Sequence, residues 1–170
     1  MKLVELEIER HDWANLRCGC GLPATHVAAD LKQLVGSTEE NGFDIESLDG
    51  HVLMPSVLFE PSVPTISVVL AALADDVSSS ARDKCLDLLL LLVAGEGQAT
   101  ESSLAGRDLV DECISAAKFG VWLLYSEIFS GRSVDASSNA YEVLSLIEND
   151  ADRIDRVRVA GGDFLRWDLR

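Results

Sequence analysis

Beyond residue 58, apolar residues recur every three or four positions with polar residues between them. This spacing places the apolar side chains along one face of an α-helix. It predicts a helix that begins after Pro61 or Pro64 and a second helix over residues 81–95. The second segment is apolar almost all round beyond its first turn. Because a helix without a polar face is normally packed between neighbours, residues 81–95 are the predicted centre of the core.

The same periodicity extends on both sides of these two helices. An unbroken apolar stripe covers residues 107–129, about six turns of helix, and another helix begins over residues 140–147. Upstream, residues 26–36 have the pattern of a short amphipathic helix. Residues 45–59 predict a further helix, which Pro55 should kink or divide because proline has no N–H to donate.

The two ends of the chain have a different pattern. Residues 4–9 alternate between polar and apolar with period two, as a half-exposed strand does. Residues 156–170 alternate in the same way around two consecutive glycines, the composition of a hairpin turn. Short β elements are therefore predicted at the termini, with a helical interpretation of either end left open. Residues 95–103 are a loop by composition.

Together these elements predict a single, mainly α-helical domain over residues 1–170. Helix pairs near residues 27–59, 62–94 and 107–148 follow each other at about 35–45 residues, the spacing of two-helix solenoid repeats. The predicted fold is a HEAT-like α-solenoid or an irregular helical bundle of about three helix pairs.

The net charge of the chain limits the kinds of molecule that the protein is expected to bind. The chain has 29 acidic residues against 14 lysines and arginines, a net charge of −15. Such a surface repels nucleic acid and anionic membranes and attracts basic partners. The sequence contains no apolar run long enough to span a membrane and no signal-peptide core. These features predict a cytoplasmic protein that binds neither nucleic acid nor membrane.

The cysteines do not form a disulfide framework. Four of them (Cys18, Cys20, Cys85 and Cys113) are too few for one in a chain of 170 residues. Cys85 and Cys113 lie in apolar helical patterns and are predicted to be small buried hydrophobic residues. Trp122 falls beside the apolar stripe of its helix and is predicted to lie in the core.

One short stretch has residue types that bind metals. His11, Cys18, Cys20 and His26 offer the imidazoles and thiolates that zinc prefers. However, one residue separates the cysteines, whereas structural zinc sites usually have at least two between paired ligands. The sequence has no second cysteine pair to complete such a site.

A structural interpretation of this stretch is therefore favoured. Gly19 and Gly21 suit the end of a helix, where the chain turns left-handed, so the segment is interpreted as a helix-ending turn with buried thiols. His51 is predicted to be a surface or packing residue. No nucleophile elbow, P-loop or dinucleotide-binding motif is present. The sequence thus predicts a protein that is not an enzyme and has neither metal nor cofactor.

The first half of the chain also carries a family resemblance. Its elements are a tryptophan followed by an arginine–cysteine turn, a histidine that opens the next helix, and an LFE-P segment. Here they are Trp13, Arg17, Cys18, Cys20, His26, Leu58, Phe59, Glu60 and Pro61. In these elements residues 12–95 resemble a group of HEAT-like bacterial proteins, many of which are regarded as immunity proteins of polymorphic and contact-dependent toxin systems. The resemblance implies a small cytoplasmic protein that neutralises one cognate toxin by binding it.

The expected function is accordingly toxin neutralisation through an acidic surface. A basic toxin, such as a nuclease that holds phosphates, offers a positive cleft to which carboxylates are attracted. Acids outside the apolar stripes are the candidate toxin-binding residues: Glu46, Asp49, Asp83, Asp87, Glu142 and Glu148. Two alternatives stay open, a metal-dependent enzyme that uses the His11, Cys18, Cys20 and His26 cluster, and a general HEAT-like protein-binding scaffold.

Overall fold

The structure is a computed structural model that describes residues 2–38 and 42–170. It is a mainly helical bundle with a small three-stranded sheet. The α-helices are α1 (Leu3–Arg10), α2 (Thr25–Val35), α3 (Ser62–Ala74), α4 (Ser79–Val93), α5 (Thr100–Leu104), α6 (Leu109–Ala117), α7 (Val121–Ser130), α8 (Val134–Ile147) and α9 (Ala151–Gly161). Short 3-10 helices are η1 (Trp13–Asn15), η2 (Ile45–Leu48), η3 (Lys118–Gly120), η4 (Gly162–Phe164) and η5 (Trp167–Leu169), and the strands are β1 (Leu53–Met54), β2 (Val57–Leu58) and β3 (Gly97–Gln98).

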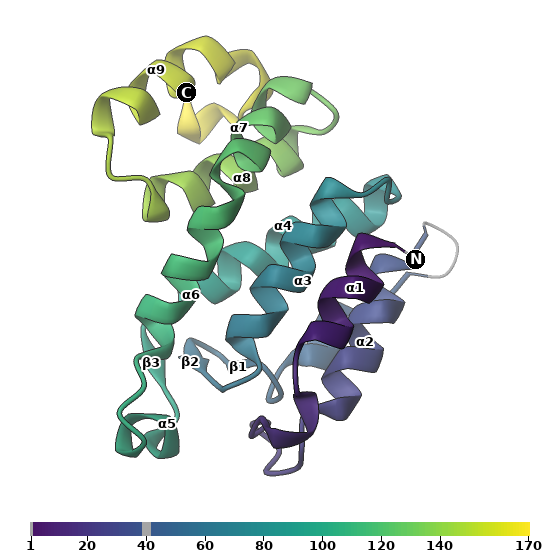
Figure 1. Cartoon of the computed structure of the whole chain (residues 1–170). Coiled ribbons are helices and arrows are strands. Elements are labelled where there is room, and N and C mark those ends of the chain that lie inside the picture. The colour runs from purple at the N-terminus through teal and green to yellow at the C-terminus, as the bar shows by residue number, and fades with distance from the viewer. Residues whose placement is uncertain (1, 39–41) are drawn as a thin grey trace.

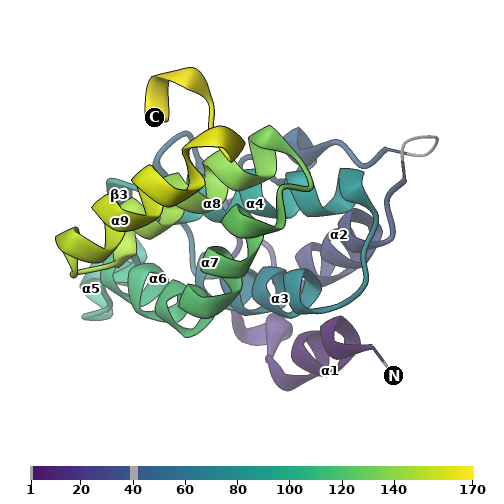
Figure 2. The same cartoon turned by 90° about the horizontal axis from the view of Figure 1, so that it is seen from above.

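Helices α3 and α4 form the middle of the bundle. α1 and α2 pack on one side of this pair and α6 on the other, while α7, α8 and α9 form a layer beyond α4 (Figures 1 and 2). Four leucines of α4 are completely buried: Leu86, Leu88, Leu89 and Leu92. The predicted position of this helix in the core is therefore confirmed, although Leu91 leaves a narrow edge of it exposed.

The centre of the chain agrees with the helices predicted from periodicity. α2, α3 and α4 occupy the segments in which apolar side chains recur at three- and four-residue steps. α3 begins directly after Pro61, and Ser78 caps α4 by accepting a hydrogen bond from the Ala81 amide at 3.0 Å. The buried thiols predicted for Cys85 and Cys113 are also confirmed.

Both termini are helical, so the β elements predicted there are wrong. Val4 and Ile8 are four residues apart and both buried, and this spacing forms the inner face of helix α1. At the other end, the two glycines end α9 and begin η4 instead of forming a hairpin turn. Over only a few residues, an alternating pattern fits both the strand period of two and the helix period of 3.6. At the N-terminus the segment forms a helix that packs against α3.

The predicted helix over residues 45–59 is also wrong. The segment forms η2 and then an antiparallel hairpin, in which β1 and β2 are joined through Pro55 and Ser56. Residues 95–103, predicted as a loop, contain β3 and most of α5, and β3 pairs with β2 in parallel. Proline cannot donate in a helix but fits a turn, so its position marks the turn of the hairpin.

The long stripe over residues 107–129 is divided into α6 and α7 by η3. A Cβ on Gly120 would lie 2.3 Å from Cδ2 of Leu70, so the absence of a side chain lets this junction approach α3 closely. The break turns Phe119 and Trp122 outward, with 93% and 75% of their surface exposed. The prediction that Trp122 lies in the core is therefore wrong.

α4 and α7 are joined by an ion pair inside the bundle. Arg82 and Glu127 are both buried, and Nη1 of the arginine lies 3.0 Å from Oε2 of the glutamate.

Among the described helices, none is both long enough and apolar enough to cross a membrane.

Candidate functional site

Two cysteines and two histidines converge near the N-terminal loop. The ligand atoms of Cys18, Cys20, His26 and His51 all lie within 4.8 Å of one another. Cys18 Sγ is 3.3 Å from His26 Nε2 and 3.1 Å from His51 Nδ1. The two imidazole nitrogens are 3.1 Å apart, and Cys20 Sγ is 3.9 Å from His26 Nε2. The four residues form a compact set of sulfur and nitrogen donors.

A tight loop brings both thiols to the same side of the backbone. The Cys18 amide donates to the Leu22 carbonyl at 3.1 Å, and the Gly21 amide donates to the Cys18 carbonyl at 2.9 Å. Gly21 adopts a φ of 81°, a left-handed conformation that favours glycine. The loop therefore depends on this glycine, as the sequence predicted, but it does not end a helix.

Gly19 carries the contact between this loop and the segment that holds His51. Its amide donates to the His51 carbonyl at 3.1 Å. A Cβ at this position would lie 2.2 Å from the carbonyl oxygen of Gly50, far closer than two such atoms can approach. The residue between the two cysteines must therefore be glycine for the loops to meet.

Substitution of Gly19 tests this contact. We expect Gly19→Ala to lower the free energy of unfolding by about 2 kcal/mol, because overpacking forces backbone shifts. The matched control is Gly162→Ala, since a Cβ there meets nothing within 4 Å and the backbone is right-handed helical. Urea denaturation measures both variants, and equal stability of the two would contradict a steric requirement at Gly19.

The helix α2 and a carbonyl group orient His26. The ring belongs to the first turn of α2, and its Nδ1 lies 3.1 Å from the Pro23 carbonyl oxygen. A carbonyl oxygen only accepts, so this hydrogen bond places a proton on Nδ1. In the neutral ring, Nε2 is then left with a lone pair that faces Cys18 and His51.

Cys18 is the buried member of the cluster, with only 4% of its surface exposed. The pKa of its thiol is raised to about 11, mainly because the group is buried. The Cys20 side chain contributes to the rise, and the amides of Cys20 and Gly19 oppose it. Cys20 itself is exposed. The expectation of two buried thiols is therefore correct for Cys18 and wrong for Cys20.

The ligand set suggested by the sequence is wrong in one member. His11 lies elsewhere, with Nε2 2.8 Å from Ser67 Oγ and 3.2 Å from Glu7 Oε1. His51 takes its place in the cluster, where its ring packs against the ring of His26 at a centroid distance of 4.7 Å. The sequence signal that was available is a glycine directly before His51, which permits the tight turn that presents its ring.

The six candidate toxin-binding acids are not gathered in one place. Glu142 forms an ion pair with Arg166 at 2.7 Å, and Glu148 forms one with Arg153 at 2.9 Å, so both carboxylates are engaged within the chain. The other four lie in two pairs: Glu46 with Asp49 at η2, and Asp83 with Asp87 on α4.

Asp83 and Asp87 share their surface with a third carboxylate. Burial is the main cause that raises the pKa of both groups, and the negative charge of Asp135 on α8 raises each pKa further. Hydrogen bonds from Ser133 to Asp83 and from Asn139 to Asp87 oppose the rise. Within residues 2–38 and 42–170, none of the three carboxylates forms an ion pair. We call Asp83, Asp87 and Asp135 the acidic patch.

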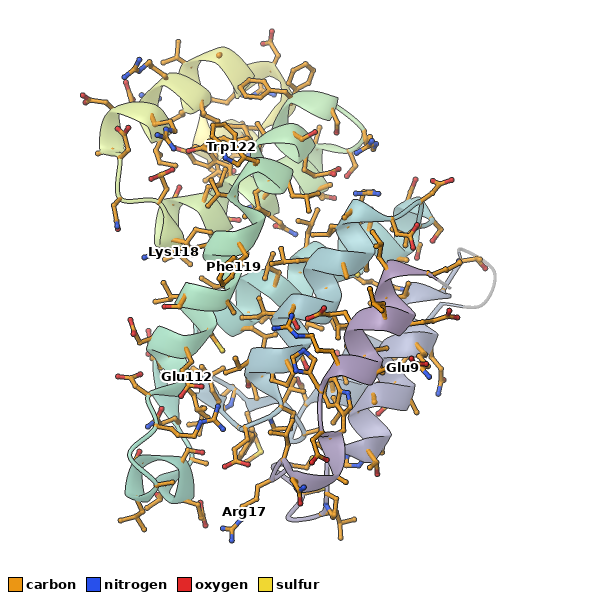
Figure 3. All side chains as sticks on the ribbon, in the orientation of Figure 1. Glu9, Arg17, Glu112, Lys118, Phe119 and Trp122 are labelled. Carbon is orange, nitrogen blue, oxygen red and sulfur yellow. The ribbon has the colours of Figure 1, made fainter. Side chains whose placement is uncertain are left out.

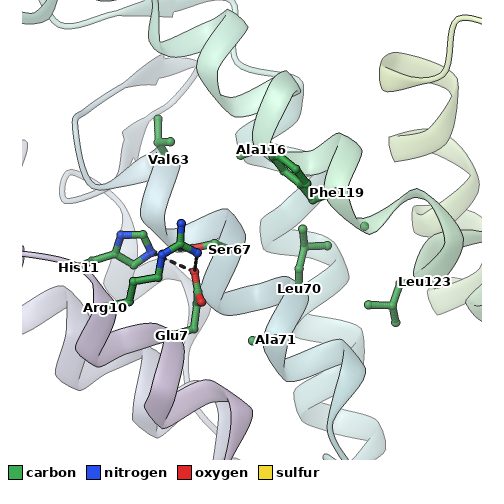
Figure 4. A pocket seen from close by; sticks show the side chains of 11 residues that line it. Glu7, Arg10, His11, Val63, Ser67, Leu70, Ala71, Ala116, Phe119 and Leu123 are labelled. Carbon is green, nitrogen blue, oxygen red and sulfur yellow. Dashed lines mark hydrogen bonds and ion pairs between the residues drawn. The ribbon is translucent and has the colours of Figure 1, made fainter.

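A separate groove of about 510 Å³ lies between α1, α3 and the α6–η3 junction. Figure 4 shows Phe119 on one side of it and Glu7, Arg10 and His11 on the other, with α3 between them. Glu7 accepts from Arg10 at 2.9 Å, so the polar side is partly charge-balanced. Figure 3 shows Phe119 and Trp122 on the part of the chain that crosses from α6 to α7.

Comparison with known proteins adds no assignment. No family model, curated protein or solved structure matches the chain. The similarity to HEAT-like immunity proteins thus stays a prediction from the sequence.

Proposed function

We propose that this protein is a cytoplasmic immunity protein that binds a basic toxin through its acidic patch and so neutralises it. The acidic patch is the observation that carries the proposal. Three acidic residues from α4 and α8 repel one another and form no ion pair among the described residues, although the charge of Arg166 partly opposes the effect at Asp87. Burial, followed by this repulsion, raises the pKa values of Asp83 and Asp87. Carboxylates held with perturbed pKa values are typical of functional surfaces.

A basic partner would reverse the unfavourable charge. Arg or Lys side chains of a partner, placed between Asp83, Asp87 and Asp135, would add countercharge to the little that Arg166 supplies at Asp87. The net charge of −15 would attract such a partner over a longer distance. The immunity assignment itself comes from the resemblance of residues 12–95 to HEAT-like immunity proteins. An immunity protein neutralises its toxin by binding it, and an acidic surface suits a basic toxin.

Neutralising two members of the patch tests the mechanism. We expect Asp83→Asn combined with Asp87→Asn to weaken toxin binding without loss of stability. Both carboxylates have a raised pKa, so their charged form is less favourable in the folded chain, and removing the charge should leave the melting temperature unchanged or higher. Asparagine can still accept the hydrogen bonds from Ser133 and Asn139. Association should also slow steeply as salt rises, since attraction is screened beyond about 8–10 Å.

Two control variants locate the interface. Asp152→Asn with Asp155→Asn removes the same charge from the C-terminal segment, where five arginines nearly balance the acids, and should leave binding unchanged. Phe119→Ser changes the exposed aromatic side chain at the groove. If Phe119→Ser weakens binding and the acidic-patch variant does not, the interface lies at the groove and the electrostatic mechanism is wrong.

Co-expression with a candidate toxin gene from the same genome tests the function itself. Host cells that produce the toxin should grow when this protein is present and stop growing when it is absent. Growth arrest despite its presence would contradict the immunity assignment, whatever the behaviour of the acidic patch.

A further inference from the structure

The distances within the cysteine–histidine cluster match the edges of a metal-centred tetrahedron. With Zn–S near 2.3 Å and Zn–N near 2.0–2.1 Å, a tetrahedral site has N–N edges of about 3.3 Å, S–N edges of about 3.5 Å and S–S edges of about 3.8 Å. The four described contacts are 3.1, 3.1, 3.3 and 3.9 Å, and the remaining separations are within 4.8 Å. We propose that Cys18, Cys20, His26 and His51 bind one zinc ion.

Hydrogen bonds alone account poorly for this geometry. Cys18 Sγ, His26 Nε2 and His51 Nδ1 form a triangle with edges of 3.1–3.3 Å. His26 contributes only a lone pair to the triangle, because its proton lies on Nδ1 toward the Pro23 carbonyl. A cation at the centre would satisfy all three atoms together. The Pro23 contact is also the outer hydrogen bond that zinc-binding histidines commonly make through their second nitrogen.

The donor set indicates both the metal and its role. Two thiolates and two imidazoles in a tetrahedral arrangement favour zinc over magnesium or calcium, which prefer oxygen. Structural zinc sites have four protein ligands, whereas catalytic sites keep a position open for water or substrate. All four positions here come from the chain, so the ion is structural. This role differs from that of the metal-dependent enzyme considered from the sequence.

The ion would fasten two segments that are distant in the sequence. Cys18 and Cys20 lie in the loop before α2, and His51 lies in the turn between η2 and β1. The Gly19–His51 hydrogen bond already brings these segments together. Because zinc binds the folded arrangement, its binding free energy adds to the stability of the fold. The inference requires no toxin and is independent of the acidic patch.

Metal analysis of the purified full chain tests the proposal. Zinc measured by mass spectrometry should be present at about one equivalent per chain. The spacing of the cysteines in the sequence predicted a protein without metal. Cobalt(II) added to the demetallated chain should give the strong d–d bands of tetrahedral cobalt together with a thiolate charge-transfer band. A chelator should lower the melting temperature, and added zinc should restore it.

Variants then identify the ligands. Outer-shell groups are typically worth 10–100-fold in metal affinity, so loss of a direct ligand in Cys20→Ser or His51→Ala should weaken zinc binding by at least about 100-fold. The matched control is His11→Gln, which changes a histidine outside the cluster and should retain full zinc. Cys20 is exposed, so its variant is expected to fold even if His51→Ala does not, and circular dichroism verifies this.

Three results would overturn the proposal. The first is a zinc content well below one equivalent in the parent chain, together with no tetrahedral cobalt spectrum. The second is an unchanged zinc affinity in Cys20→Ser. The third is loss of zinc in His11→Gln. The last result would instead support the ligand set suggested by the sequence.

Discussion

Replacing Arg82 with methionine is expected to lower the free energy of unfolding by about 4 kcal/mol, the largest loss we expect from one substitution in this chain. Arg82 is 8% exposed, and its guanidinium donates to Glu127 at 3.0 Å, to the Leu73 carbonyl at 3.1 Å and to the Asp75 carbonyl at 3.2 Å. Methionine fills similar space but donates nothing. Glu127, which is 3% exposed, then keeps the exposed Arg132 as its charged partner among the described residues, together with a long hydrogen bond of 3.5 Å from Ser130 Oγ. Urea denaturation at neutral pH measures the loss.

Removing both charges should cost less than removing one. In Arg82→Met with Glu127→Leu, neither charge is left alone inside the bundle, so the double variant should recover a large part of the stability. The matched control is Arg158→Met, which breaks the surface pair with Asp155 and should cost less than about 1 kcal/mol. A loss in Arg82→Met as small as in Arg158→Met would show that the buried pair has little importance for the fold.

Truncation of Leu89 to alanine is expected to cost about 3 kcal/mol. This side chain is completely buried on α4, a helix that packs against α3 and α8. Its removal therefore leaves a cavity that the neighbouring side chains fill only in part. The unfolding free energy from chemical denaturation, with an unchanged slope against denaturant, is the relevant measurement.

Leu91 provides the control within the same helix. It is 45% exposed, so Leu91→Ala makes the same chemical change with little cavity and should cost less than about 1 kcal/mol. Equal losses at the two positions would mean that α4 is not oriented as described.

Local patterns predicted the parts of the fold that depend on local contacts. The three- and four-residue periodicity located α2, α3 and α4, since each buries one or more faces along a continuous segment. The same periodicity could not predict which apolar residue stays exposed. Trp122 falls beside the stripe of its helix, but η3 interrupts that helix and the ring turns outward.

The candidate site was predicted to the extent that its residues are close in sequence. Cys18, Cys20 and His26 were noted by residue type, although their spacing was the argument against a metal site, and His51 was left out because only folding brings it near. Gly19 and Gly50 make that approach possible, and the need for glycine there arises from a contact between two distant loops. Spacing rules treat a site as a local motif, and here one ligand in four is not local.

The uneven spacing of the four ligands along the chain affects how tightly the unfolded and the folded chain would each bind an ion. Cys18 and His26 are 8 residues apart, but His51 is 33 residues from Cys18. An unfolded chain can therefore still hold an ion loosely with its three neighbouring ligands, and metal that binds the unfolded state stabilises the native state less. The metal-binding free energy gained on folding is then the contribution of His51. This ligand joins the other three only when the η2–β1 turn docks against the cysteine loop. Cobalt spectra recorded during refolding would follow that docking step directly, as the coordination changes from three protein ligands to four.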